Sequence, residues 1–133
     1  MDVKYLPIKN YGWVAYDELI ESMCQASILL SISEQNGVQI SSKIFEYMSM
    51  GKPIIHIYYV DNDVNLSYLK EYPLCLCIKA DVANIESNAM ILEKWINKNH
   101  GRNIDYISVE ELYSKLTPRY VCDQLLELYQ KNL

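Results

Sequence analysis

The sequence predicts an α/β fold built on a parallel sheet of about four strands with flanking helices. Short apolar runs alternate along the chain with segments whose apolar residues recur at helical spacing. The apolar runs are nearly unbroken, which is typical of strands covered on both faces, as in parallel sheets. The 133 residues are half apolar and only 22% charged, which suits one compact domain spanning residues 1–133.

The first elements are two strands and the helix between them. Residues 3–6 are short and apolar and end at Pro7, so they predict a strand. Asp17 is the expected N-cap of a helix whose apolar stripe consists of Leu19, Ile20, Met23 and Cys24. Residues 26–33 predict a strand covered on both faces, because residues 28–32 are almost all apolar.

The central part of the chain repeats this alternation. A polar loop at residues 34–37 leads to a predicted helix at residues 41–50, which Gly51 ends. The inner side of this helix is expected to carry Ile40, Ile44, Phe45 and Met48. Three further elements follow: a strand at residues 54–60, a short helix at residues 66–72 and a strand at residues 74–78.

The remaining chain is predicted to be helical. Residues 85–99 carry apolar residues at helical spacing and end before Gly101. A capping box at residues 108–111 predicts a helix at residues 112–116. Pro118 is expected to open the last helix, because proline suits the first helical position. The apolar face of that helix consists of Val121, Leu125 and Leu128.

Composition excludes several classes of function. A net charge of −5 without a basic block disfavours a nucleic-acid binder. No apolar run is long enough to span a bilayer, so no transmembrane segment is expected. No export signal follows Met1, and we expect a cytoplasmic protein, which could be membrane-peripheral through a longer, full-length protein. The four cysteines form no C-x-x-C pair and are expected to be buried, reduced thiols.

The best candidate binding site is the loop at residues 33–40. Ligands of open α/β sheets bind at the carboxyl ends of the strands, and this loop joins such an end to a helix that starts with Ser41 and Ser42. Free N–H groups and the positive end of the helix dipole suit an anion such as a diphosphate. Lys43 adds a positive charge that can reach it.

Glu46 lies on the same helical face as Ser42 and Lys43. A carboxylate at this position can accept hydrogen bonds from the two vicinal hydroxyls of a ribose. Lys43 and Glu46 can also pair with each other on a solvated helix face, and the spacing alone favours this simpler interpretation.

Other polar residues have structural interpretations. His56 is expected to be a satisfied histidine inside or at the end of its strand. Asp61 and Asp63 are interpreted as turn residues rather than as a metal pair.

The string SSKIFEYMSMGKPII at residues 41–55 closely resembles the donor-site helix of group-1, family-4-like glycosyltransferases of the GT-B fold. In that family a helix of the form (S/P)-x-K-x-x-E-Y-x-x-x-G-K-P-(V/I)-(I/V) follows the loop that wraps the nucleotide sugar. Residues 12–19 resemble the family's G-x-V-x-x-x-E-L element, and residues 26–33 its A-D-(I/V)-x-(I/L)-x-x-S strand. The resemblance is strong over residues 10–60, and the rest of the chain is compatible in pattern.

The resemblance implies roles for individual residues. Glu46 matches the glutamate that binds the ribose hydroxyls of the donor, and Trp13 or Val14 would border the base. The backbone that contacts sugar and diphosphate would be that of Gly37, Val38, Gln39 and Ile40, and the residues at the diphosphate end would be Ser41, Ser42 and Lys43. Many relatives carry a second, sugar-contacting glutamate at the position of Val38, so the sequence does not indicate the sugar. Catalytic residues are not assigned.

The implied fold is a Rossmann-like donor-binding domain. The implied reaction is transfer of a hexose from a nucleoside diphosphate sugar, most commonly a UDP-sugar, to a glycan or lipid-linked acceptor in polysaccharide biosynthesis. Family members usually need no metal, so no cofactor is expected. Their active site lies between two such domains, and the N-terminal acceptor domain has no counterpart here. We therefore expect an incomplete C-terminal domain that binds donor weakly, does not turn over alone and self-associates through an exposed sheet edge.

Two other classes stay open. One is a non-catalytic α/β interaction module that binds a partner chain through its exposed edge. The other is a receiver-like or flavodoxin-like regulatory domain, which would need an acidic cluster after the first strand and a phosphorylatable aspartate after a central strand. The strand at residues 26–33 ends instead in Ser33 and Glu34.

Overall fold

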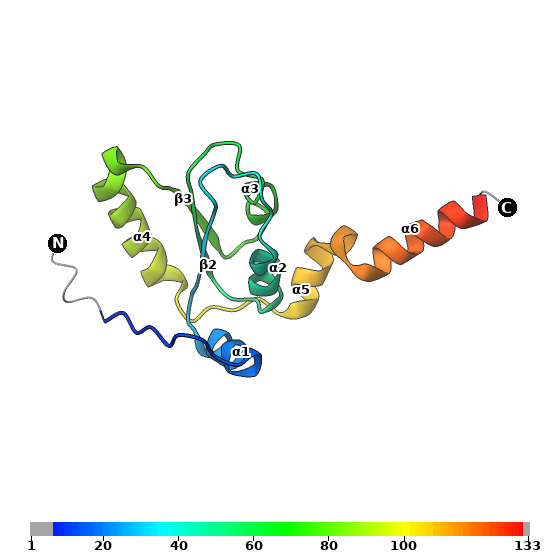
Figure 1. The fold of residues 1–133 in the computed structure, drawn as a ribbon, viewed down its shortest axis with the longest axis horizontal. Helices are drawn as coiled ribbons and strands as arrows, with labels where there is room; N and C mark the ends of the chain where they lie inside the picture. The colour runs from blue at the N-terminus through cyan, green and yellow to red at the C-terminus, as the bar shows by residue number, and fades with distance from the viewer. Residues whose placement is uncertain (1–6, 132–133) are drawn as a thin grey trace.

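The centre of the molecule is a three-stranded parallel sheet in the order β1-β2-β3, seen in a computed structural model that describes residues 7–131 (Figure 1). The strands are β1 (Leu29–Ile32), β2 (Ile54–Tyr58) and β3 (Cys75–Lys79). In the register of the sheet, His56 lies between Ser31 and Cys77. The α/β class and the parallel pairing are confirmed. The predicted strand at residues 3–6 lies outside the described residues.

Strand β1 is covered on one face, which corrects the prediction that both its faces are buried. Leu29 and Ser31 are buried, whereas Leu30 and Ile32 are 53% and 56% exposed. The helix on the exposed side, α4 (Ile85–Asn99), packs against β3 at the other edge of the sheet and leaves Leu30 open. The apolar run at residues 28–32 therefore predicted the strand correctly, but the prediction that both faces are buried was wrong.

The core lies between the other face of the sheet and three helices: α2 (Ser42–Ser49), α3 (Leu66–Leu69) and α5 (Tyr106–Leu112). Its buried residues are Ile44, Met48, Ile54, Leu69, Tyr72, Leu74 and Val109. Three of the four residues predicted for the inner side of α2 belong to the core or pack on it. The fourth, Ile40, is 45% exposed, because it belongs to the preceding loop rather than to the helix.

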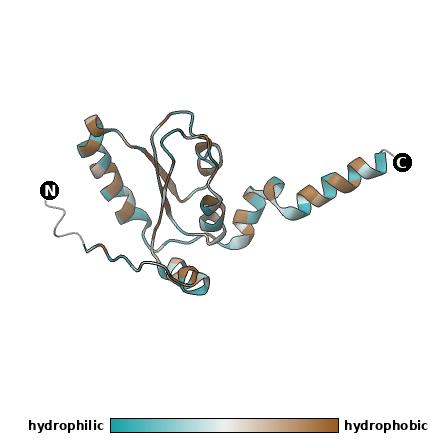
Figure 2. Cartoon of the chain, in the orientation of Figure 1, coloured by the Kyte–Doolittle hydropathy of each residue, from teal (hydrophilic) through white to brown (hydrophobic). Residues whose placement is uncertain are grey.

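Helix α4 (Ile85–Asn99) has the predicted bounds and lies on the opposite side of the sheet from α2 and α3 (Figure 1). It follows a short 3-10 turn, η2 (Val82–Asn84). An open groove of about 690 Å³ lies between α4 and the part of the sheet that α4 leaves uncovered. Hydrophobic residues occur on both β3 and α4 (Figure 2). The apolar residues of this groove include Leu30, Ile55, Ile57, Ile78, Ile85 and Leu92.

Helix α1 (Tyr16–Gln25) precedes β1 and begins two residues earlier than an N-cap at Asp17 predicts. Its N-cap is Ala15, whose carbonyl accepts from Leu19 N–H at 3.0 Å, so Asp17 already belongs to the first turn. The assignment of Asp17 as N-cap was therefore wrong. In the first turn its carboxylate still complements the positive end of the helix dipole. Met23 is the buried residue of the helix.

The C-terminal helices differ from the prediction at both ends of α5, which runs from Tyr106 to Leu112 rather than over residues 112–116. Asp105, not Ser108, caps α5, because its carboxylate accepts from both the N–H of Ser108 at 3.0 Å and its hydroxyl at 2.6 Å. The predicted capping box at residues 108–111 thus lies inside a helix, and Ser114–Leu116 forms a 3-10 turn, η3. Helix α6 (Pro118–Lys131) starts at the predicted proline and extends away from the sheet with no buried residue (Figure 1).

The cysteines are less buried than expected. Cys24 and Cys122 are exposed, because α1 and α6 present little surface to the core. Cys75 and Cys77 are half-buried on β3, and their sulfur atoms lie 3.8 Å apart on one face of the strand, as their spacing predicts.

Candidate functional site

The loop between β1 and α2 lies at the carboxyl end of the sheet and makes a sharp bend at Gly37. This glycine has φ +65°, a conformation that other residues rarely adopt. A Cβ at this position would lie 2.5 Å from Val60 Cγ2, so the loop also approaches the turn after β2 too closely for a side chain. The N–H of Gly37 donates to Glu34 O at 3.1 Å, and its carbonyl accepts from Val64 N–H at 3.0 Å.

A pocket of about 270 Å³ opens between the end of β1 and the start of α2. Its lining consists of Ile32, Ser33, Glu34, Gln39, Ile40, Ser41, Ser42 and Asn65. Four of these, Gln39, Ile40, Ser41 and Ser42, are predicted donor-site residues. Ser41 is the N-cap of α2 and makes no side-chain capping hydrogen bond, and the first turn of α2 contains no acidic residue. The pocket therefore adjoins the N–H groups that an α-helix leaves without intrahelical partners.

Lys43 and Glu46 form an ion pair beside this pocket, with Lys43 Nζ 2.8 Å from Glu46 Oε2. The hydrogen bond to Glu46 raises the pKa of Lys43 above its ordinary value. Both side chains are partly exposed, at 45% and 35%, and neither lines the pocket. The pairing that the spacing favours is confirmed. Ribose binding by Glu46 stays a prediction, and the carboxylate is not enclosed in the core.

The remaining predicted site residues do not line the pocket. Gly37 is buried at the bend of the loop, and Val38 is 67% exposed beside it. Trp13 is fully exposed and Val14 is 39% exposed, both ahead of α1. None of these four residues therefore lines the pocket between the loop and α2.

The loop is held to the segment after β2 by Asn65, a residue that is only 1% exposed. Its Oδ1 accepts from Ser41 N–H at 2.9 Å, and its Nδ2 donates to Gln39 O at 3.1 Å. The Asn65 amide is fixed by Asp63, whose Oδ1 accepts from Asn65 N–H at 2.8 Å and from Nδ2 at 2.9 Å. Sequence reasoning missed this role. The available signal was the position of Asn65 just after a strand that neighbours β1 in a parallel sheet.

A chain of polar side chains runs beneath the pocket. His56 is fully buried, with Nε2 3.0 Å from Ser33 Oγ and Nδ1 3.1 Å from Ser31 Oγ. Burial lowers the pKa of His56 below its ordinary value, although Asp63 opposes this effect. We therefore describe His56 as neutral at pH 7. The expectation of a satisfied interior histidine is confirmed.

Asp63 continues this chain. Burial opposes ionisation of Asp63, but hydrogen bonds from Ser33 and Asn65 outweigh burial and hold its pKa below the ordinary value. Its Oδ2 is buried without a hydrogen bond of ordinary geometry to the residues described. One assignment of protons satisfies these hydrogen-bonded side chains. Nε2–H of His56 donates to Ser33 Oγ, and the Ser33 hydroxyl, which can rotate, directs its proton toward Asp63.

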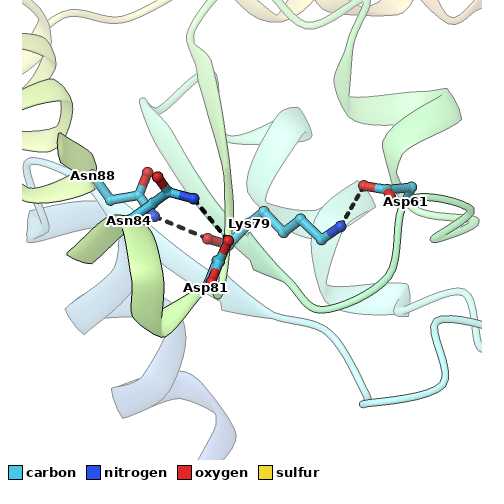
Figure 3. A network of polar contacts seen from close by, with 5 residues as sticks. All are labelled: Asp61, Lys79, Asp81, Asn84 and Asn88. Atoms are coloured by element: carbon cyan, nitrogen blue, oxygen red, sulfur yellow. Dashed lines mark hydrogen bonds and ion pairs between the residues drawn. The ribbon is translucent and has the colours of Figure 1, made fainter.

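A separate polar cluster lies at the carboxyl end of β3 (Figure 3). Lys79 Nζ lies 2.7 Å from Asp61 Oδ1 and so ties β3 to the turn after β2. Asp81 caps η2 by accepting from Ala83 N–H at 2.9 Å, and it also accepts from Asn84 Nδ2 at 2.7 Å. Asn88 donates to the carbonyl of Lys79 at 3.0 Å. The N–H of Asp63 donates to Val60 O at 3.2 Å, so both Asp61 and Asp63 belong to the turn, as predicted.

Searches for a metal centre and for a membrane span give negative results within the described range. Over residues 7–131, no three or more His, Cys, Asp or Glu side chains are grouped so that they could hold a metal ion. None of the helices described is both long enough and apolar enough to cross a bilayer.

Comparisons with protein-family models, with curated proteins and with solved structures return no match for this chain.

Proposed function

We propose that this chain forms part of the donor-binding domain of a GT-B glycosyltransferase. The enzyme transfers a sugar from a nucleoside diphosphate sugar, with UDP as the nucleotide, to a glycan or lipid-linked acceptor. This chain supplies the binding site for the donor and is inactive on its own. The observation that carries the proposal is the position of the Lys43–Glu46 pair in the first two turns of α2, the helix whose N-cap Ser41 and first residue Ser42 line the pocket.

The start of α2 gives one end of the pocket features that favour a bound diphosphate. The positive end of the α2 dipole faces an anion bound at the helix start. Lys43 contributes a full positive charge in the first turn, where there is no acidic residue. Glu34 is the acidic residue of the lining, and it lies at the β1 end of the pocket. These features support an anion at the Ser41 and Ser42 end.

The Lys43–Glu46 pair is weak enough to exchange for a ligand. Ion pairs between partly exposed side chains on a helix contribute about 0.3–0.5 kcal/mol. A charge-assisted hydrogen bond from a ribose hydroxyl to a carboxylate contributes about 1.5–3 kcal/mol. A nucleoside diphosphate can therefore replace the contact between Lys43 and Glu46. Lys43 then binds the diphosphate, and Glu46 accepts hydrogen bonds from the ribose hydroxyls.

Titration with UDP, followed by the amide NMR signals of the ¹⁵N-labelled chain, tests this proposal. We expect shifts at Ser41 and Ser42 and a dissociation constant on the order of 1 mM. Glu46→Gln should weaken binding about tenfold or more, because a neutral amide accepts more weakly than a carboxylate. Glu93→Gln, an exposed change on α4, is the matched control and should leave affinity unchanged. Absence of shifts at these amides, or equal affinity of Glu46→Gln and wild type, would refute the proposal.

The groove beside α4 favours a second candidate, a non-catalytic interaction module. Leu30 and Ile32 are more than half exposed on β1. The groove has a volume of about 690 Å³ and is lined mainly by apolar residues. Apolar surface of this kind is typical of protein–protein contacts. A module of this class would give no response to UDP, so the same titration separates the two candidates.

A further inference from the structure

We infer that Asn65 is a positioning residue for donor binding, an inference that rests on the proposed function. Its side-chain amide holds the backbone of Gln39 and Ser41 in the shape that forms the pocket. Asn65 lies outside the string that resembles glycosyltransferases, and it follows a different strand from the loop that it fixes.

The geometry of the contact fits an amide side chain. The loop presents one backbone acceptor, Gln39 O, and one backbone donor, Ser41 N–H, to the same side chain. An amide has an acceptor and two donors on one planar group, so it satisfies both backbone atoms at once. In the reverse orientation of the amide, Nδ2 would face the N–H of Ser41, donor against donor, and Oδ1 would face Gln39 O, acceptor against acceptor. The assignment of Oδ1 and Nδ2 is therefore fixed by the loop itself.

Asp63 prevents the Asn65 amide from turning away. The two N–H bonds of Nδ2 are both used, one toward Gln39 O at 3.1 Å and one toward Asp63 Oδ1 at 2.9 Å. The backbone N–H of Asn65 also donates to Asp63 Oδ1. With the bond from Val64 N–H to Gly37 O, residues 63–65 hold the loop at three places.

The consequence for binding is preorganisation. Gln39, Ser41 and Asn65 all line the pocket, and Ser41 sets the direction in which α2 begins. N–H groups that are already aimed at the place of an anion need no reorganisation when it binds. Without the Asn65 amide, the carbonyl of Gln39 and the N–H of Ser41 lose their side-chain partner and must form hydrogen bonds to water instead.

The first test is the Asn65→Ala variant of the full chain. Amide hydrogen exchange at Ser41 should become about tenfold faster or more, because the acceptor of its N–H is removed, while exchange in β2 changes much less. The affinity for UDP should fall about tenfold or more. Asn99→Ala is the matched control, because Asn99 is also buried and bonded at both ends of its amide, to Trp95 O and Arg102, but lies at the end of α4. It should leave both readouts unchanged.

The second test uses Asn65→Asp, which separates positioning from general loss of stability. At neutral pH the new carboxylate keeps the acceptor for Ser41 N–H, but it repels Asp63 and cannot donate to Gln39 O. A proton on the carboxyl restores the donor. The affinity of this variant for UDP, relative to wild type, should therefore recover about threefold or more between pH 7.5 and 5.5. The relative affinity of Asn65→Ala should not change over this range.

The outcomes are distinguishable. Wild type that binds no UDP overturns the proposed function and the donor part of this inference with it. Wild type and Asn65→Ala that bind UDP equally overturn the inference alone. Equal exchange at Ser41 in these two proteins overturns the role of Asn65 in fixing the loop, whatever UDP does.

Discussion

His56 is a fully buried histidine whose two ring nitrogens both contact serine hydroxyls. These contacts join neighbouring strands, since Ser31 lies directly beside His56 in the sheet. A neutral imidazole with one donor and one acceptor is satisfied by two hydroxyls, whereas an imidazolium would have to desolvate a charge in the interior. Burial accordingly lowers the pKa of His56, and the neutral form is the one that folding favours.

Acidification should therefore destabilise the protein through His56. The unfolded state binds a proton near the ordinary pKa of 6.5 while the folded state does not, so stability is lost as pH falls below about 6.5 toward the lowered folded pKa. The loss is at most about 1.4 kcal/mol per pH unit. Urea denaturation at pH 7.5, 6.5 and 5.5 measures it. His56→Gln should abolish the decrease of unfolding free energy between pH 7.5 and 5.5. His100→Gln, which changes the exposed histidine, should keep this decrease. An unchanged decrease in His56→Gln would refute the assignment.

Local chemistry was predictable from sequence, and contacts between distant residues were not. Lys43 and Glu46 are one turn apart, so their pairing follows from helix geometry alone. Asn65 contacts Ser41 and Gln39 across 24 and 26 residues, and no local pattern reports such contacts. If the parallel pairing of β1 and β2 had been known, it would have predicted that the loops following these strands lie at the same edge of the sheet. It would not have singled out Asn65 from Asn62 or Asp61.

At the scale of elements, the end of α2 is a junction that only glycine fits. Gly51 has φ +68°, and its carbonyl accepts from Ile104 N–H at 2.9 Å. A Cβ on Gly51 would run into the carbonyl oxygen of Ile104. The segment that leads from α4 to α5 therefore passes directly against the end of α2, and this contact helps to hold α5 over the core.

Replacing Gly51 with alanine should be much more costly than the same change at Gly101. Gly101 also has positive φ, at +74°, but open space surrounds its Cβ position. Gly101→Ala should cost about 1–2 kcal/mol of unfolding free energy from backbone strain. Gly51→Ala should cost at least about 3 kcal/mol, because the backbone at Ile104 must also move. Chemical denaturation of both variants measures the difference, and equal losses would contradict the steric argument.

Element types were easier to predict than their boundaries and burial. The periodicity of residues 85–99 gave α4 with its observed bounds, since a long amphipathic segment carries its own signal. At α5, the sequence predicted a cap at Ser108, whereas Asp105 accepts from the N–H of Ser108 and caps the helix three residues earlier. The exposure of Leu30 and Ile32 depends on which helix covers β1, which the strand's own sequence does not determine.

At the scale of the whole molecule, apolar surface is left uncovered beside an open strand. Within the described residues, β1 pairs with β2 alone, so one of its edges carries free backbone groups. The adjoining groove is lined by Leu30, Ile55 and Ile57. Exposed edges and apolar surface of this kind promote association between chains.

We therefore expect the isolated chain to self-associate at tens of micromolar, as measured by light scattering. Leu30→Lys should shift the population toward monomer, because it places a charge on the open strand without touching the core face. Ile107→Lys, at an exposed residue of α5 outside the groove, serves as the control and should not change the association. A monodisperse wild-type monomer at this concentration would refute the expectation.

The claim on which the functional account depends is that Glu46 binds the ribose hydroxyls of a nucleoside diphosphate. The most direct measurement is the affinity lost when UDP is replaced by 2′,3′-dideoxy-UDP, compared between wild type and Glu46→Gln. The account predicts a loss of about tenfold or more in wild type and a much smaller loss in Glu46→Gln. Lys43→Gln breaks the same ion pair but keeps the carboxylate, so it should retain the full loss. Equal losses in wild type and Glu46→Gln would contradict the account.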